Sequence, residues 1–99
     1  MLEHLTIASL SEQLHTKFRV AVEPEKTVEL ELDEVQARGD VAGQTERFSA
    51  FFRGPLEQFL PQSIYAMEHD ALGSFELFIV PIRQGADGFY YEAVFNRVK

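Results

Sequence analysis

The sequence predicts an all-β, mainly antiparallel fold: a small six-stranded barrel or sandwich with one or two short helices. Three observations predict it. Apolar and polar residues alternate along most of the chain, glycine and proline turns separate the alternating segments, and nine phenylalanines supply bulk for one core. Alternation with period two is typical of strands with one buried face. Short sequential hairpins favour an antiparallel barrel or sandwich, and residues 1–99 together are expected to form a single β domain.

Six segments have the alternation of strands. It is clearest where Val28, Leu30 and Leu32 are expected to face the core while acidic residues between them face water. The expected strands are residues 17–22, 27–35, 47–53, 63–69, 74–83 and 89–98. Residues 38–46 are polar and contain two glycines, so we expect a flexible hairpin loop there. The last two strands form a hairpin closed by residues 84–88, whose Asp-Gly pair is a strong turn signal.

Two short helical segments are expected outside the strands. Ser9 and Glu12 have the spacing of a capping box, which predicts a helix of one or two turns ending near His15. Pro55 can occupy the first position of a second helical turn over residues 56–60. The apolar side chains of that turn, Leu56, Phe59 and Leu60, are then expected to plug one end of the barrel.

Composition excludes several classes of partner. Sixteen acidic against nine basic side chains give a formal charge of −7, which repels phosphates and argues against nucleic acid and anionic membrane surfaces. The chain has no run of about 18 apolar residues that could span a bilayer, and its first residues lack the pattern of a secretory signal. We therefore expect a soluble, cytoplasmic protein. Without cysteine, thiolate chemistry and disulfides are excluded.

No catalytic, cofactor or metal site is predicted, and we expect the protein not to be an enzyme. Glu29, Glu31 and Asp33 could offer oxygens to calcium, but no calcium-binding loop surrounds them, so a solvated strand face is the preferred interpretation. Glu68, His69 and Asp70 form the densest polar cluster. Adjacent strand residues point to opposite faces, so these three side chains are not expected to converge. Motifs for a nucleophilic serine or for phosphate binding are absent.

The last predicted hairpin has apolar residues on both faces, which favours a barrel over a sandwich. One face can fill the interior, whereas the outer face, with Phe78, Val80, Tyr90 and Val94, needs a cover. That cover could be a short helix or another subunit, because monomers rarely expose such patches. These four residues are our candidates for a partner-binding surface, and a homo-oligomer is one form that it could take.

Several blocks of sequence together resemble a known family. They are Leu2-x-x-Leu5-Thr6, Phe52-Arg53-Gly54-Pro55-Leu56-x-x-Phe59-Leu60-Pro61-Gln62, Tyr65-x-x-Glu68-His69, Gly73-x-x-x-Leu77-Phe78-x-Val80-Pro81 and Tyr91-Glu92-Ala93-Val94-Phe95-Asn96. Over nearly its whole length the chain is similar to a family of small bacterial domains of unknown function, about ninety residues long, often encoded near phage-tail-collar-like proteins. The resemblance supplies no catalytic residues.

The resemblance and the absent chemistry together favour a structural or assembly domain. Such a domain would bind protein partners, and the resemblance implies tail-collar-like or fibre proteins among them. The alternative is a barrel module that binds a small ligand in its interior or mouth. It is less favoured because a barrel of few strands is filled by its own side chains.

Overall fold

A computed structural model describes residues 4–40 and 45–98 and contains one short helix and six strands. The elements are α1 (Ile7–Ser11), β1 (Lys17–Glu23), β2 (Lys26–Asp40), β3 (Thr45–Gly54), β4 (Ser63–His69), β5 (Gly73–Gly85) and β6 (Gly88–Val98). All strand pairs are antiparallel, and the sheet closes as a ring in the order β1-β2-β3-β6-β5-β4. The predicted six-stranded antiparallel fold is confirmed.

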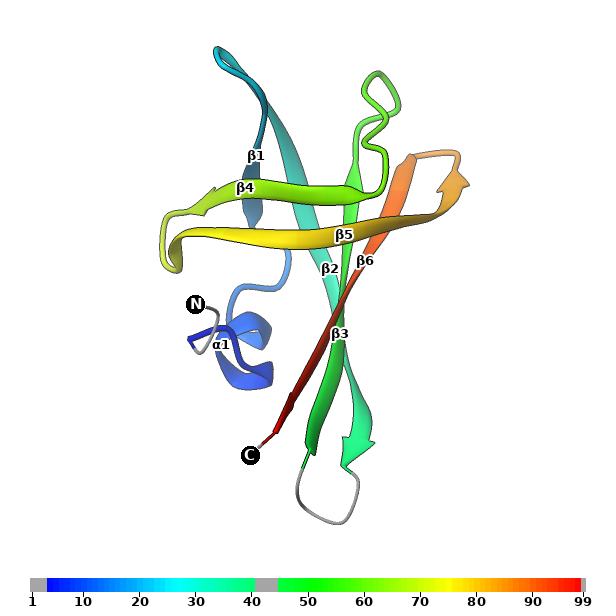
Figure 1. The fold of residues 1–99 in the computed structure, drawn as a ribbon. Helices are drawn as coiled ribbons and strands as arrows, with labels where there is room; N and C mark the ends of the chain where they lie inside the picture. The colour runs from blue at the N-terminus through cyan, green and yellow to red at the C-terminus, as the bar shows by residue number, and fades with distance from the viewer. Residues whose placement is uncertain (1–3, 41–44, 99) are drawn as a thin grey trace.

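Two groups of strands cross each other to form the barrel. The long strands β2, β3 and β6 run together down the molecule, while β4 and β5 run across them in Figure 1. β4 pairs with β5 along its whole length, from Ser63 to His69. The ring is completed between β1 and β4 by only two residue pairs, Arg19 with Glu68 and Val20 with Met67.

The helix begins three residues earlier than the sequence pattern predicts. Thr6, not Ser9, is the N-cap: its hydroxyl accepts a hydrogen bond from the Ser9 N–H at 3.0 Å, and Ser9 Oγ accepts one from the Thr6 N–H at 2.9 Å. Serine thus takes the place that glutamate usually has in a capping box. The helix places Leu10 in the core beside β2.

The loop expected over residues 38–46 is shorter than predicted. β2 continues to Asp40 and β3 starts at Thr45, while residues 41–44 lie outside the described residues. Polar side chains on the outer face of this hairpin bond to one another and to β6: Arg38 Nη1 donates to Ser49 Oγ at 3.3 Å, and that hydroxyl donates to Glu92 of β6 at 2.7 Å. Arg38 therefore belongs to a polar strand face and not to a loop.

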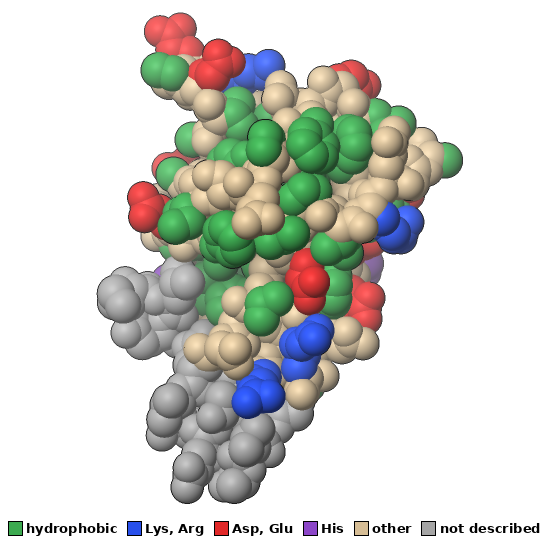
Figure 2. Space-filling view, turned by 45° about the vertical axis from the view of Figure 1, so that its right-hand side comes forward, with side chains coloured by type: hydrophobic (Ala, Val, Ile, Leu, Met, Phe, Trp, Pro, Cys, Tyr) green, Lys and Arg blue, Asp and Glu red, His purple; other side chains and the backbone are tan. Residues whose placement is uncertain are grey.

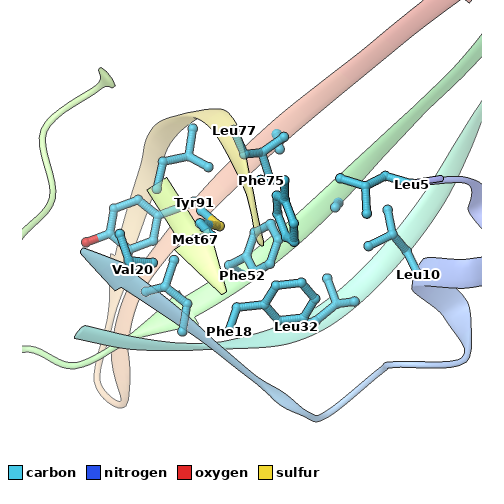
Figure 3. Packing of buried hydrophobic residues seen from close by; sticks show 14 of the residues in the cluster. Leu5, Leu10, Phe18, Val20, Leu32, Phe52, Met67, Phe75, Leu77 and Tyr91 are labelled. Atoms are coloured by element: carbon cyan, nitrogen blue, oxygen red, sulfur yellow. The ribbon is translucent and has the colours of Figure 1, made fainter. Parts of the chain in front are cut away.

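Alternate residues of all six strands fill the barrel with apolar side chains. Figure 3 shows Phe18, Phe52 and Leu32 meeting beside Leu10 of the helix. The rings of Phe18 and Phe52 pack edge to face with centroids 5.2 Å apart. Val28, Leu30 and Leu32 are buried as predicted. The core comprises Leu5, Leu10, Phe18, Val20, Val28, Leu30, Leu32, Phe48, Ala50, Phe52, Leu60, Met67, Phe75, Leu77, Ile79, Tyr91, Ala93 and Phe95.

The segment between β3 and β4 contains a turn but no helix, so the second predicted helical turn is wrong. The Gln58 N–H donates to the Pro55 carbonyl at 3.4 Å, and the chain then runs on irregularly to β4. Of the three residues expected to plug the barrel end, only Leu60 is buried; Leu56 and Phe59 are exposed. Leu60 is fixed by its N–H, which donates to the buried Tyr91 hydroxyl at 3.0 Å.

Among residues 4–40 and 45–98, no helix has the length and apolar character needed to cross a membrane.

Candidate functional site

The outer face of β4, β5 and β6 exposes several large apolar side chains. Ile64 and Phe78 stand opposite each other in the register of β4 and β5, and they are 63% and 46% exposed. Val94 of β6 is 56% exposed. Val80 is half-buried and pairs with Glu92, so it lies on the same face, two residues from Phe78. We call Ile64, Phe78, Val80 and Val94 the apolar face; Figure 2 views this side obliquely and shows hydrophobic side chains gathered there.

Phe78, Val80 and Val94, three of the four sequence candidates, belong to the apolar face, whereas polar groups surround the fourth. Tyr90 is half-buried near the start of β6, with the Arg83 guanidinium 3.8 Å above its ring centre. Its hydroxyl donates to Asp87 at 2.9 Å, and Arg53 contacts the same carboxylate at 3.1 Å. The hydrogen bond from Tyr90, helped by Arg53, holds the pKa of Asp87 below its ordinary value. Tyr90 therefore belongs to a polar cluster.

A row of charges crosses the outer surface of β1, β2 and β3. Glu31 Oε1 lies 3.2 Å from Arg53 and 3.5 Å from Lys17, its register neighbours on β3 and β1. Partial burial raises the pKa of Glu31, but the charges of Arg53 and Lys17 outweigh it and leave the pKa below its ordinary value. This carboxylate is ionised and already paired at neutral pH.

The same row contains the one His-carboxylate cluster found among the described residues. Ligand atoms of His15, Glu31 and Asp33 lie within 4.8 Å of one another. Sequence reasoning missed His15, because its backbone is left-handed (φ 68°) and its N–H reaches across to the Leu32 carbonyl at 2.7 Å. A cation here would compete with the two basic side chains that already neutralise Glu31, and the cluster is open to water.

The side chains of Glu68, His69 and Asp70 do not converge, as predicted from their adjacent positions at the end of one strand. Glu68 and Asp70 are exposed and contact Arg19 at 3.9 and 3.0 Å, whereas His69 points into the core and packs against Phe18 with ring centres 4.3 Å apart. This separation follows from the alternation of a strand.

His69 instead has a structural role at the β4–β5 turn. Its Nδ1 accepts hydrogen bonds from the N–H groups of Ala71 and Leu72 at 3.0 and 3.3 Å. Its Nε2 lies 2.8 Å from Thr16 Oγ1, which donates its own hydrogen to the Gln13 carbonyl and so accepts from His69. Both ring nitrogens are thus used by the neutral Nε2–H tautomer. Burial lowers the pKa of His69, which favours this neutral form.

A groove lies on the outer surface where β1 and β4 diverge. It has a volume of about 430 Å³ and is mostly apolar. Ala21 and Ala66 line it from the two strands, together with Met67 and Phe75. Because Ala66 is two residues from Ile64 on the same face of β4, the groove continues the apolar face toward β1.

Comparison with known proteins gives one family. The model of DUF6916, described as a domain of unknown function, matches residues 5–95. The chain belongs to this family. No curated protein and no solved structure matches the chain. The part matched by the DUF6916 model includes α1, all of β1 to β5, the apolar face and the groove.

The interior of this DUF6916 domain is occupied by its own side chains. Phe18, Phe52 and Tyr91 are fully buried there, and every buried side-chain nitrogen or oxygen in the described part of the chain has a hydrogen-bond partner. The hollows found in the described part of the chain open on the outer surface of the barrel and not into its interior. The small-ligand alternative thus gains no support from the barrel interior, and the outer surface is the better candidate for a binding site.

Proposed function

We propose that this protein is a structural or assembly domain that binds a protein partner through the apolar face. The observation that carries the proposal is the side-by-side exposure of Ile64 and Phe78, with Val94 exposed on the neighbouring strand. Soluble monomers rarely expose a contiguous apolar surface of more than a few hundred Å², and larger patches rimmed by polar residues mark interaction sites. Binding would remove these side chains from water, a gain of roughly 25 cal/mol per Å² before the costs of association.

Charged residues around the apolar face give it the composition of an interface. Glu92 lies beside Val80, with Arg38 3.4 Å from its carboxylate, and Glu76 is the next outward residue before Phe78 on β5. Interfaces commonly combine an apolar centre with a polar rim. The partner's matching surface is therefore apolar at its centre and polar at its edge.

The sequence resemblance suggests which partners to test first. Phage-tail-collar-like or fibre proteins encoded near the gene are the primary candidates, and a second copy of this chain is the other. Binding of each purified candidate to the immobilised domain would be measured by interferometry, and self-association by light scattering over a range of concentrations.

The decisive variant is Val94→Asp, which places a carboxylate on the apolar face. We expect it to weaken partner binding at least about ten-fold, equivalent to about 1.4 kcal/mol. Ala8→Asp adds the same charge at an exposed position of α1 and should leave binding unchanged. The proposal is wrong if the wild-type chain binds none of these proteins and stays monomeric, or if Val94→Asp binds like the wild type.

A further inference from the structure

The edge of β4 that faces β1 is left largely without a strand partner. Both strands have seven residues, but their register comprises only two pairs, at Glu68 and Met67 on β4. In the described part of the chain, residues 63–66 therefore have β5 on one side and no paired strand on the other. Such an edge presents unpaired N–H and C=O groups to which another extended chain can bond.

This edge also lacks the features that usually protect exposed strands. Natural proteins block sheet edges with charged side chains, prolines or bulges. Residues 63–66 are Ser, Ile, Tyr and Ala, and their register with β5 is regular. The facing part of β1 is less regular, because its pairing with β2 on the other side shifts between Ala21 and Glu23. Residues 63–66 of β4 are therefore the more regular template for an added strand.

The groove beside this edge can receive alternate side chains of an added strand. Successive residues of a strand point to opposite faces, so every second side chain would enter the groove, between Ala21 and Ala66. The next outward residue on β4 is Ile64, the most exposed large apolar side chain among those found. Small and apolar walls suit aliphatic side chains.

The charges around the groove are mostly negative. Arg19 is its one basic lining residue, and it is already in contact with Glu68 and Asp70. Glu76 also lines the groove, so one cation stands against three carboxylates. A basic residue of the bound segment would be attracted to this surplus, whereas an acidic one would be repelled.

We propose that the free edge of β4 binds an extended segment of the partner as an added strand, whose groove-facing residues, every second one along the segment, combine aliphatic side chains with a Lys or Arg. This inference rests on the proposed protein-binding function and names how the partner is held. Main-chain hydrogen bonds to residues 63–66 provide affinity, as in other cases of strand addition, and the groove selects the alternate side chains.

The test is selection from a random peptide library on the wild-type domain, followed by anisotropy measurements with the enriched peptides. We expect sequences in which a Lys or Arg stands two residues from an aliphatic residue, so that both face the groove. N-methylation at alternate residues, which removes the N–H donors, should weaken binding at least ten-fold. Ala66→Trp, which fills the groove from an exposed position, should do the same, whereas Ala86→Trp in the β5–β6 turn should not. Circular dichroism would verify that both variants are folded.

The outcomes separate this inference from the proposed function. Failure to enrich any peptide, or enriched peptides that tolerate N-methylation and Ala66→Trp, would overturn strand addition. If the whole-protein partner is lost with Val94→Asp but bound normally by Ala66→Trp, the apolar face binds the partner and the β4 edge does not. If both variants lose the partner, the face and the edge form one binding surface.

Discussion

The hydroxyl of Tyr91 offers a stringent test of how the loop between β3 and β4 is held. This side chain is fully buried, and its oxygen accepts a hydrogen bond from the Leu60 N–H at 3.0 Å. Leu60 is itself only 1% exposed, so water cannot replace the lost acceptor without a local opening. Tyr91→Phe removes one oxygen atom and leaves the ring in place.

The expected loss of folding stability in Tyr91→Phe follows from the Leu60 N–H, which the substitution leaves without an acceptor. A buried donor without an acceptor costs about 1–3 kcal/mol. Each kcal/mol lowers the Tm of a domain of roughly 60–100 residues by about 4–8 °C. Tyr65→Phe is the matched control, because Tyr65 also donates to this loop, at 2.6 Å to the Pro61 carbonyl, but in a bond that water can reach. Its expected cost is about 0.5 kcal/mol or less, as for other surface changes.

Urea unfolding at equilibrium, followed by far-ultraviolet circular dichroism, measures both variants. The slope of the unfolding free energy against urea concentration should be unchanged. A lower midpoint then reports a lower free energy of unfolding. Amide exchange at Leu60 should accelerate in Tyr91→Phe and not in Tyr65→Phe. The reasoning fails if the two variants lose the same stability, or if Tyr91→Phe unfolds at the wild-type midpoint.

Two further predictions concern the core and its one buried histidine. Phe52→Ala should cost roughly 3–5 kcal/mol in urea unfolding, because the ring is fully buried against Phe18; a loss below about 1 kcal/mol would contradict its place in the core. Burial lowers the pKa of His69 in the folded state below its ordinary 6.5, so the unfolded chain takes up the proton at a higher pH than the folded one. The free energy of unfolding should therefore fall as the pH drops below 6.5 toward the folded pKa. His69→Asn keeps an acceptor for the Ala71 N–H and should be less sensitive in this range; an unchanged pH dependence of unfolding would refute this role.

Local alternation predicted the strands because each has one face in a shared core. The strand starting at Lys17 and the one spanning Ser63–His69 were placed at their observed starts. The prediction failed for the ends of β2 and β3, where residues 38–46 have the composition of a loop. Polarity is compatible with strand structure there, because Arg38 meets Glu92, 54 residues away, on the outer surface. No local pattern reveals such a pairing.

The candidate surface was predicted only in part, for a similar reason. Phe78, Val80 and Val94 were identified because apolar residues stood on both faces of one hairpin. Ile64 was missed because its importance depends on lying opposite Phe78. The groove depends on where β1 and β4 stop pairing, and that follows from how the whole ring closes.

The polar groups of the outer surface also indicate where a partner would bind most easily. Glu31 is paired with Lys17 and Arg53, and Glu92 accepts from Arg38 and Ser49. A partner covering these groups would have to dehydrate or replace interactions that the chain already makes, which offsets what the new contacts contribute. The apolar face and the β4 edge differ from these paired charges. The apolar face exposes side chains that water hydrates unfavourably, and the adjoining β4 edge has main-chain groups without a strand partner at residues 63–66. The free-energy cost of covering the surface is therefore lowest where these two features adjoin, along β4.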